Sequence, residues 1–250
     1  MHLPDPEFPP ILTGHPIKAP AKAFETACRR AAEGELGAAD LVWARDTQRA
    51  EMALILEPEV SRRQALQIKP LSFAAMADSL GALMPPKTAV HLRWPNSILL
   101  NGAVAGQLQF ALAQSRPDEV PDWLVAGVSI QVASPHIDRE PGEAEQLTSI
   151  FDEGGGELDR TQMLRSISAH MLSWLQVWQD DGFKAVADPF IGRVEGYEHE
   201  TDFNVAGRLV RGRVLGMSDE MQLLVRLTDG KTVALENEAS APTSGMDVTG

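Results

Sequence analysis

The sequence has 250 residues, of which 44% are hydrophobic and 23% are charged, a composition typical of a soluble globular chain that buries one large core. A net charge of −13, without a run of lysine or arginine, disfavours contact with nucleic acid because the surface repels phosphates. No apolar stretch approaches the roughly 20 residues of a membrane span, and no secretory signal is recognisable, so we expect a cytoplasmic protein without a membrane partner.

The N-terminal part predicts an extended arm and a helix. Residues 1–20 are rich in proline, and residues 21–34 contain good helix formers and end at Gly34, a common terminator of helices. Cys28 lies at helical spacing from Phe24 and is expected to be a small core residue. As the only cysteine, it excludes an intrachain disulfide framework and a cysteine-built zinc site.

The next elements alternate between strand and helix patterns. Apolar runs of strand length occur at 41–44 and 52–58. A helix is expected from Ser72, with one apolar stripe, and Pro85-Pro86 ends it.

Four strand-like segments follow and predict a largely antiparallel sheet. Asn101-Gly102 separates two of them and predicts a two-residue hairpin, because both residues tolerate the positive φ that a type I′ turn needs. The expected strands are residues 90–94, 98–100, 103–113 and 123–132.

A long helix and a small β module complete the chain. Asp159 and Gln162 form a capping-box pattern at the start of the helix, which ends near Asp181-Gly182. Beyond Glu195 the apolar residues recur with period two, which predicts a small barrel of short strands. Residues 241–250 are expected to form a disordered tail.

General catalytic and metal motifs are missing from the sequence. The six histidines include no pair at helical ligand spacing, so we predict no metal site. Gly154–Gly156 lacks the lysine of a phosphate loop and has acidic neighbours, which favours a flexible linker. No nucleophile elbow and no dinucleotide-binding glycine fingerprint is present.

The segment RWPNSILLNGAVAG, followed by VAGVSIQV, resembles the core of the biotin protein ligases and their lipoate ligase relatives. The family pattern is a basic residue, W-P-N-D, a strand, a turn, K-x-A-G and later a G-x-G-I-N strand. The long helix and the β module resemble the elements that follow in that family, so the resemblance covers most of the chain.

The resemblance implies an α+β fold of the class II synthetase and biotin-ligase type. Its mixed, largely antiparallel sheet packs with helices in residues 1–195, and a small SH3-like β-barrel with the tail occupies residues 196–250. The family activates a small carboxylic acid with ATP and magnesium and passes it to a lysine of a biotinyl or lipoyl carrier domain. The residues that match the ligand-binding motifs are Arg93, Trp94, Pro95, Asn96, Gly106 and Gly127.

Several matched positions depart from the family pattern. Ser97 replaces the acidic residue after W-P-N, and Ala103 or Val104 replaces the lysine. The segment that matches the loop closing over the ligand retains only Arg45 and Arg49 as cations. Two further segments differ: Ala19-Pro20-Ala21 replaces S-T-N, and Gly127-Val128-Ser129-Ile130-Gln131 replaces G-x-G-I-N.

These observations leave two hypotheses. In the first, the protein is a divergent ligase that activates biotin, lipoate or octanoate through an acyl-adenylate, with Arg45 and Arg49 substituting for the lost cations. In the second, the protein is a pseudoenzyme that binds a small ligand or a carrier domain without catalysis. For Trp94-Pro95-Asn96, a purely structural role as core aromatic, strand end and turn also remains open. The acid, the acceptor protein and the oligomeric state are not specified by the sequence.

Overall fold

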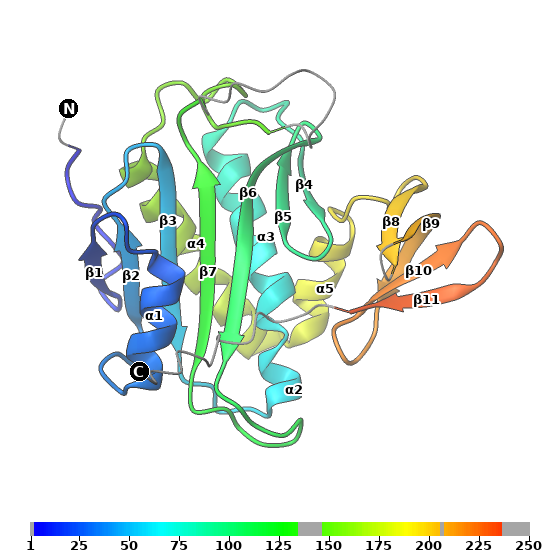
Figure 1. The fold of residues 1–250 in the computed structure, drawn as a ribbon, viewed down its shortest axis with the longest axis horizontal. Coiled ribbons are helices and arrows are strands. Elements are labelled where there is room, and N and C mark those ends of the chain that lie inside the picture. Colours follow the sequence, from blue (N-terminus) through cyan, green and yellow to red (C-terminus); the bar gives the residue numbers. More distant parts are fainter. Residues whose placement is uncertain (1–2, 135–146, 206–207, 237–250) are drawn as a thin grey trace, which may run out of the picture.

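A computed structural model describes residues 3–134, 147–205 and 208–236. These residues form a seven-stranded sheet with helices on both faces and a smaller four-stranded sheet (Figure 1). In chain order the elements are β1 Thr13–Ile17, α1 Ala23–Ala32, β2 Asp40–Ala44, β3 Arg49–Leu56, α2 Arg62–Ala65, α3 Ile68–Leu83, β4 Val90–Arg93, β5 Ser97–Leu100, β6 Ala103–Leu112, β7 Leu124–Gln131, α4 Arg160–Asp181, α5 Phe183–Ile191, β8 Thr201–Val205, β9 Arg208–Met217, β10 Leu223–Leu227 and β11 Thr232–Leu235.

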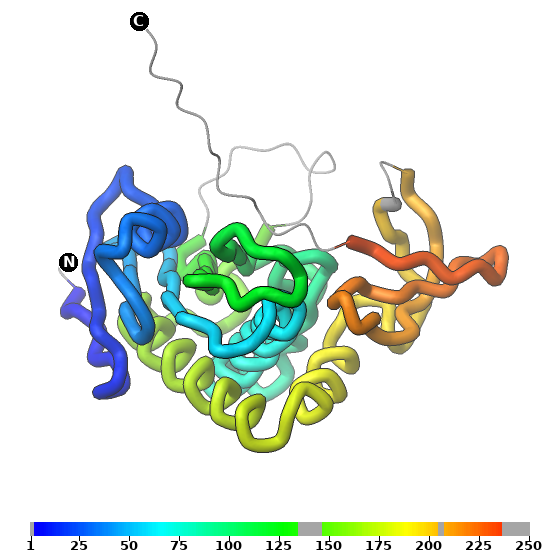
Figure 2. The backbone as a smooth tube through the Cα atoms, turned by 90° about the horizontal axis from the view of Figure 1, so that it is seen from below, coloured from blue at the N-terminus to red at the C-terminus, as the bar shows by residue number. Residues whose placement is uncertain are grey.

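The large sheet is mixed and mainly antiparallel, as predicted. Its strand order is β1-β2-β3-β7-β6-β5-β4, and only the edge pair β1 and β2 is parallel. Helices α3, α4 and α5 lie on one side of this sheet and α1 lies on the other (Figures 1 and 2). The α+β fold class is therefore confirmed.

The face toward α3 carries the larger core. Met52, Leu54, Leu108 and Ile130 of the sheet are at most 3% exposed and belong to one apolar cluster with both long helices. Helix α3 is buried on nearly all sides rather than along one stripe, because α4 and α5 cover the side that faces away from the sheet.

Two local predictions are confirmed in detail. Asn101 and Gly102 have φ values of 49° and 88° and join β5 to β6 in a tight turn. Asp159 caps α4 by accepting a hydrogen bond from the Gln162 main-chain N–H over 2.9 Å, and the Gln162 side chain completes the capping box.

Several segments differ from the predictions. Thr13–Ile17 forms strand β1 within the expected extended arm, and the helices α2 (Arg62–Ala65) and α5 (Phe183–Ile191) were not predicted. Gly154–Gly156 belongs to a packed turn rather than a flexible linker, because a Cβ on Gly155 would lie 2.9 Å from both the Ile150 carbonyl oxygen and Met84 Sδ.

The C-terminal module is an antiparallel sheet with the order β11-β10-β9-β8. Its inner side, with Phe203, Val214 and Leu223, joins the main core. The boundary at residue 196 and closure into an SH3-like barrel remain predictions. The predicted tail at 241–250 lies outside the described residues.

Candidate functional site

The α1 face of the large sheet has an apolar part and a polar part. Beneath α1, strands β2, β3, β6 and β7 present small or aliphatic side chains. Side chains alternate between the two faces of a strand, so every second residue further along these strands lies on the same face as the apolar ones. Beyond α1 these residues are polar. The apolar sheet residues are Val42, Ala53, Ile55, Ala111 and Val125, and the polar ones are Arg49, Glu51, Gln107, Gln109, Ser129 and Gln131.

The strand register joins three of these polar positions and Ser97 of β5 into one row. Glu51 pairs with Ser129, Ser129 pairs with Gln107, and Gln107 pairs with Ser97 across strands β3, β7, β6 and β5. Directly opposed residues of antiparallel strands lie on the same face. Gln107 is exposed although its strand is in the interior of the sheet. We call this row the polar floor; Gln107 in it is exposed, Ser97 is half-buried, and Glu51 and Ser129 are buried.

Two adjoining cavities lie over this floor and share Arg49 and Gln107. The first has a volume of about 230 Å³ and the second about 140 Å³. The first is also lined by Ser97, Val104, Ala105, Gly106, Gln131, Leu147 and Thr148, and the second by Lys22, Phe24, Glu25, Glu51, Gln109 and Ser129. Together we call them the sheet cavity.

Arg49 is the most informative residue of the sheet cavity. It starts β3, opposite Gln131, and its Nε is buried with no hydrogen-bond partner among the described residues. A buried donor without an acceptor is costly, and a charged one more so. An anionic group of a ligand in the sheet cavity would remove that cost.

The start of α1 is fixed at the edge of the same cavity. Glu51 is 7% exposed and accepts a hydrogen bond from the Ala23 main-chain N–H over 2.6 Å. A carboxylate is stabilised at the N-terminus of a helix, where N–H groups lack partners within the helix. Glu51 therefore holds α1 on the sheet, and Arg49 and Lys22 are the cations in the lining of the sheet cavity.

The predicted glycines lie where the backbone approaches other groups closely. Gly106 lines the sheet cavity, and a Cβ there would lie 2.4 Å from the Ser129 carbonyl oxygen. A Cβ on Gly127 would lie 2.7 Å from the Phe24 ring, which covers this position from α1. Gly106 is thus at the cavity, whereas Gly127 lies beneath α1.

The Arg93–Asn96 segment is placed differently from the predicted pocket. Among the described residues, none of its side chains lines the sheet cavity. Arg93 Nε donates to Glu195 over 2.7 Å, and the Trp94 indole N–H donates to the Glu236 carbonyl oxygen over 3.1 Å. Pro95 is exposed, and the Asn96 main-chain carbonyl accepts from the Leu108 N–H. Arg93 and Trp94 thus connect the main domain to the segments before and after the small sheet.

Arg45 is also outside the sheet cavity. Its Nε donates to Asp5 over 3.0 Å, and its guanidinium lies 5.5 Å from the centre of the Trp43 ring. The hydrogen bond to Asp5 raises the Arg45 pKa. The structure therefore brings together Arg49 and Gly106 of the predicted set and separates Arg45 from them.

Sequence reasoning missed most of the polar floor. Gln107 and Gln109 alternate with Leu108 and Phe110, a pattern that indicates one accessible face of a strand. That signal was present in the sequence, but the register that places Ser129 beside Gln107 was not.

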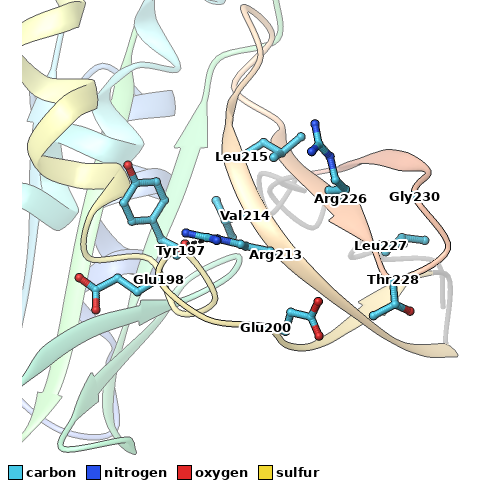
Figure 3. Close-up of a pocket in the computed structure, with 10 residues that line it drawn as sticks. All are labelled: Tyr197, Glu198, Glu200, Arg213, Val214, Leu215, Arg226, Leu227, Thr228 and Gly230. Carbon is cyan, nitrogen blue, oxygen red and sulfur yellow. Dashed lines mark hydrogen bonds between the residues drawn. The ribbon is translucent and has the colours of Figure 1, made fainter.

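A further cavity of about 620 Å³ lies in the C-terminal module (Figure 3). Glu198, Glu200, Arg213 and Arg226 line it, so both charges are represented, and Arg213 Nε donates to the Tyr197 carbonyl oxygen. This mixture favours no single ligand charge. Among the described residues, no three acidic, histidine or cysteine side chains are grouped to hold a metal ion, and no helix has the length and apolar character to cross a membrane.

Comparisons with known proteins agree with this fold. The model of the "Biotin/lipoate A/B protein ligase family" matches residues 8–192. The crystal structure of a biotin protein ligase-like protein of unknown function from Silicibacter sp. TM1040 is 30% identical, with a TM-score of 0.80, and covers 92% of this chain and 96% of that one.

Two more distant proteins are also similar. A biotin–(acetyl-CoA-carboxylase) ligase of Paracoccus denitrificans is 23% identical over 180 residues, which are 72% of this chain and 75% of the relative. The biotin protein ligase of Aquifex aeolicus, solved in complex with biotin and ATP, is 15% identical with a TM-score of 0.66, and covers 88% of this chain and 95% of that one. At that identity the likeness shows the fold.

Proposed function

The chain belongs to the biotin/lipoate A/B protein ligase family, and from this premise we propose that it binds a small carboxylic acid in the sheet cavity and activates it as an acyl-adenylate. The acid is of the biotin, lipoate or octanoate class, and the acyl group passes to a lysine of a carrier domain. The observation that carries the proposal is Arg49, which lines the cavity and whose buried Nε has no hydrogen-bond partner among the described residues.

Arg49 provides the contact for the carboxylate. A guanidinium donates two parallel hydrogen bonds to a carboxylate, and such charge-assisted bonds are about twice as strong as neutral ones. Gln107, Gln131 and Ser129 supply neutral donors and acceptors on the floor beside it. An acid with an amide-like or ureido group, or with a flexible aliphatic chain, would be oriented there with its carboxylate at Arg49.

The reaction needs the carboxylate oxygen and the α-phosphorus of ATP at bonding distance. ATP supplies the adenylyl group, with pyrophosphate leaving as the carboxylate oxygen bonds to phosphorus. The carrier lysine amine then bonds to the acyl carbon and AMP leaves. This chain contributes position and positive charge, because Arg49 lies where the sheet cavity's two parts meet and offsets the repulsion between the anions.

The described residues fit the phosphates of ATP better than they fit a protein-held magnesium ion. Arg49 lines both parts of the cavity and can contact phosphate oxygens there. In contrast, the described residues that line the part of the cavity beside Ser97 include no carboxylate. In the other part Glu51 is engaged by the Ala23 N–H, and the remaining carboxylate is the exposed Glu25 on α1. Magnesium commonly binds one or two protein carboxylates together with the phosphates. We therefore assign no step to magnesium.

A second function is favoured by the contacts of the motif residues. Arg93 and Trp94 are engaged with Glu195 and Glu236, and Ser97 stands in the cavity where the family pattern has an acid. Such a site supports a protein that binds the acid, or a carrier domain, without adenylation. The two functions share the ligand contact at Arg49 and differ in turnover.

The experiment that separates them is acid-dependent pyrophosphate exchange. The purified chain is incubated with ATP, magnesium, labelled pyrophosphate and biotin, lipoate or octanoate, beside a thermal-shift assay with the same acids. We expect exchange above background with one acid. A thermal shift without exchange would favour the binding protein, and no response in either assay would contradict both functions.

A further inference from the structure

Another large cavity lies at the opposite end of strands β3 and β7, away from the sheet cavity. Its volume is about 670 Å³, and Leu56 at the end of β3 and Leu124 at the start of β7 contribute to its wall. Arg49 lies at the opposite end of β3, about 23 Å away at the rise of an extended strand. The two cavities are therefore separate, and we call this second one the distal cavity.

The walls of the distal cavity are mainly apolar and come from segments far apart in the chain. The C-terminal end of α4 and the start of α5 contribute Trp178 and Phe183, opposite Leu56 and Ile68. The Trp178 indole N–H donates to Gln67 Oε1 over 2.7 Å, which fixes the ring in the wall. Its volume and lining match the size and character of small-molecule sites in proteins.

The charged side chains that line the distal cavity, among the described residues, are all acidic. Glu57 and Glu59 line it, and no lysine, arginine or histidine is among its described lining residues. Both glutamates are exposed, and they flank Pro58 just after β3. An apolar cavity with carboxylates and a fixed indole ring is complementary to a cation, because the aromatic face also attracts positive charge.

We propose that the distal cavity binds an amphiphilic amine, a small molecule with an apolar body and a protonated amino group. The apolar body lies between Trp178 and the aliphatic wall, and the ammonium group lies beside Glu57 and Glu59. The proposal does not rest on the ligase function, because the lining residues of the two cavities are entirely different. The C-terminal cavity of mixed charge is a poorer match for such a ligand.

The test uses three probes of nearly equal shape and different charge. Binding of 4-phenylbutylamine, 4-phenyl-1-butanol and 4-phenylbutyrate to the full chain is measured by calorimetry near neutral pH. We expect the amine to bind about three- to tenfold more tightly than the alcohol, because it gains two interactions with exposed charges. The carboxylate should bind least tightly in the distal cavity, because the glutamates repel it. Added salt should weaken only the amine preference.

Variants then locate the site. The double variant Glu57→Gln/Glu59→Gln should remove the preference for the amine and leave alcohol binding unchanged. Asp219→Asn/Glu220→Gln, which removes two exposed charges from the C-terminal module, should retain the preference. Trp178→Phe should abolish the change in tryptophan fluorescence that the amine causes. The proposal is overturned if the alcohol binds as tightly as the amine, if no probe binds, or if both double variants behave alike.

Discussion

The apolar part and the polar part of the sheet face that α1 covers are made by the same strands. The first is buried under the helix, and the second lines a cavity. Beneath α1, Ala53 and Val125 are fully buried and pack against the helix. A few residues along the same strands, Arg49 and Gln107 line an open cavity. The backbone geometry is common to both parts, so the difference lies in the side chains and in where α1 begins. Glu51, which holds the Ala23 N–H, marks the boundary.

This comparison shows how one sheet can carry both a buried core and an open polar surface. An apolar side chain on the exposed part would gain little from burial, and a polar one beneath α1 would lose its hydrogen bonds to water. Stability and ligand binding should therefore respond to substitutions in different parts of this face. The following predictions test that separation.

The largest contrast is expected in thiol reactivity. Cys28 lies on the side of α1 that packs against the sheet, and its burial, with a smaller contribution from Glu25, raises the pKa of the thiol to about 12. At about pH 8 only about one Cys28 thiol in 10⁴ is ionised, against roughly a quarter of ordinary thiols. A disulfide reagent should therefore modify Cys28 over a thousandfold more slowly than the cysteine introduced in a Gln107→Cys variant.

The pH dependence of the two thiols sharpens this test. Because the thiolate reacts, the Cys28 rate should rise about tenfold per pH unit toward pH 12, whereas the introduced thiol should level off above about pH 8.5. Rates are followed in the folded protein by the released chromophore. Modification of Cys28 within tenfold of the introduced thiol would show that α1 does not seal this part of the face.

The second contrast concerns stability. Ile55 is fully buried beneath α1, so Ile55→Ala should lower the free energy of unfolding by about 2–5 kcal/mol. Gln107 is exposed, and Gln107→Ala should change the same free energy by no more than about 0.5 kcal/mol. Urea unfolding measures both values. Equal losses would mean that the polar floor is as important to folding as the apolar part.

The sequence predicted those elements whose signals are local. Asn101-Gly102 and the Asp159 cap each determine a conformation through their own neighbours, and both were confirmed. Strand β1 was missed because Thr13–Ile17 contains a proline and has no clear alternation of apolar residues. Helix α5 was missed because Pro189 disguises its apolar pattern.

The candidate site could be predicted only in part, because it depends on contacts between distant segments. The family resemblance selected Arg49 and Gly106, which lie in the sheet cavity. It also selected Trp94, whose indole partner Glu236 is 142 residues away. No local pattern specifies such a contact, nor the register that aligns Glu51, Ser129 and Gln107.

The smallest and most specific contrast compares two arginines. Arg45 precedes β3, and Arg49 is the first residue of that strand. Arg49→Ala should weaken binding of the acid about 10- to 100-fold, the value of a charge-assisted hydrogen bond of roughly 1.5–3 kcal/mol. The free energy of unfolding of this variant should stay the same or rise slightly, because the substitution removes a buried donor that has no partner among the residues described by the structure. Calorimetry with biotin, lipoate and octanoate, beside urea unfolding, measures both effects.

Arg45→Ala is the matched control, because it removes the same charge four residues earlier. Arg45 is engaged with Asp5 and stacks over Trp43, outside the sheet cavity. It should therefore leave acid binding unchanged within about twofold and change stability little, because an exposed ion pair contributes little to folding. If Arg45→Ala weakens acid binding as much as Arg49→Ala, the loop before β3 contacts the ligand, and the unpartnered Nε of Arg49 is not the feature that selects the acid.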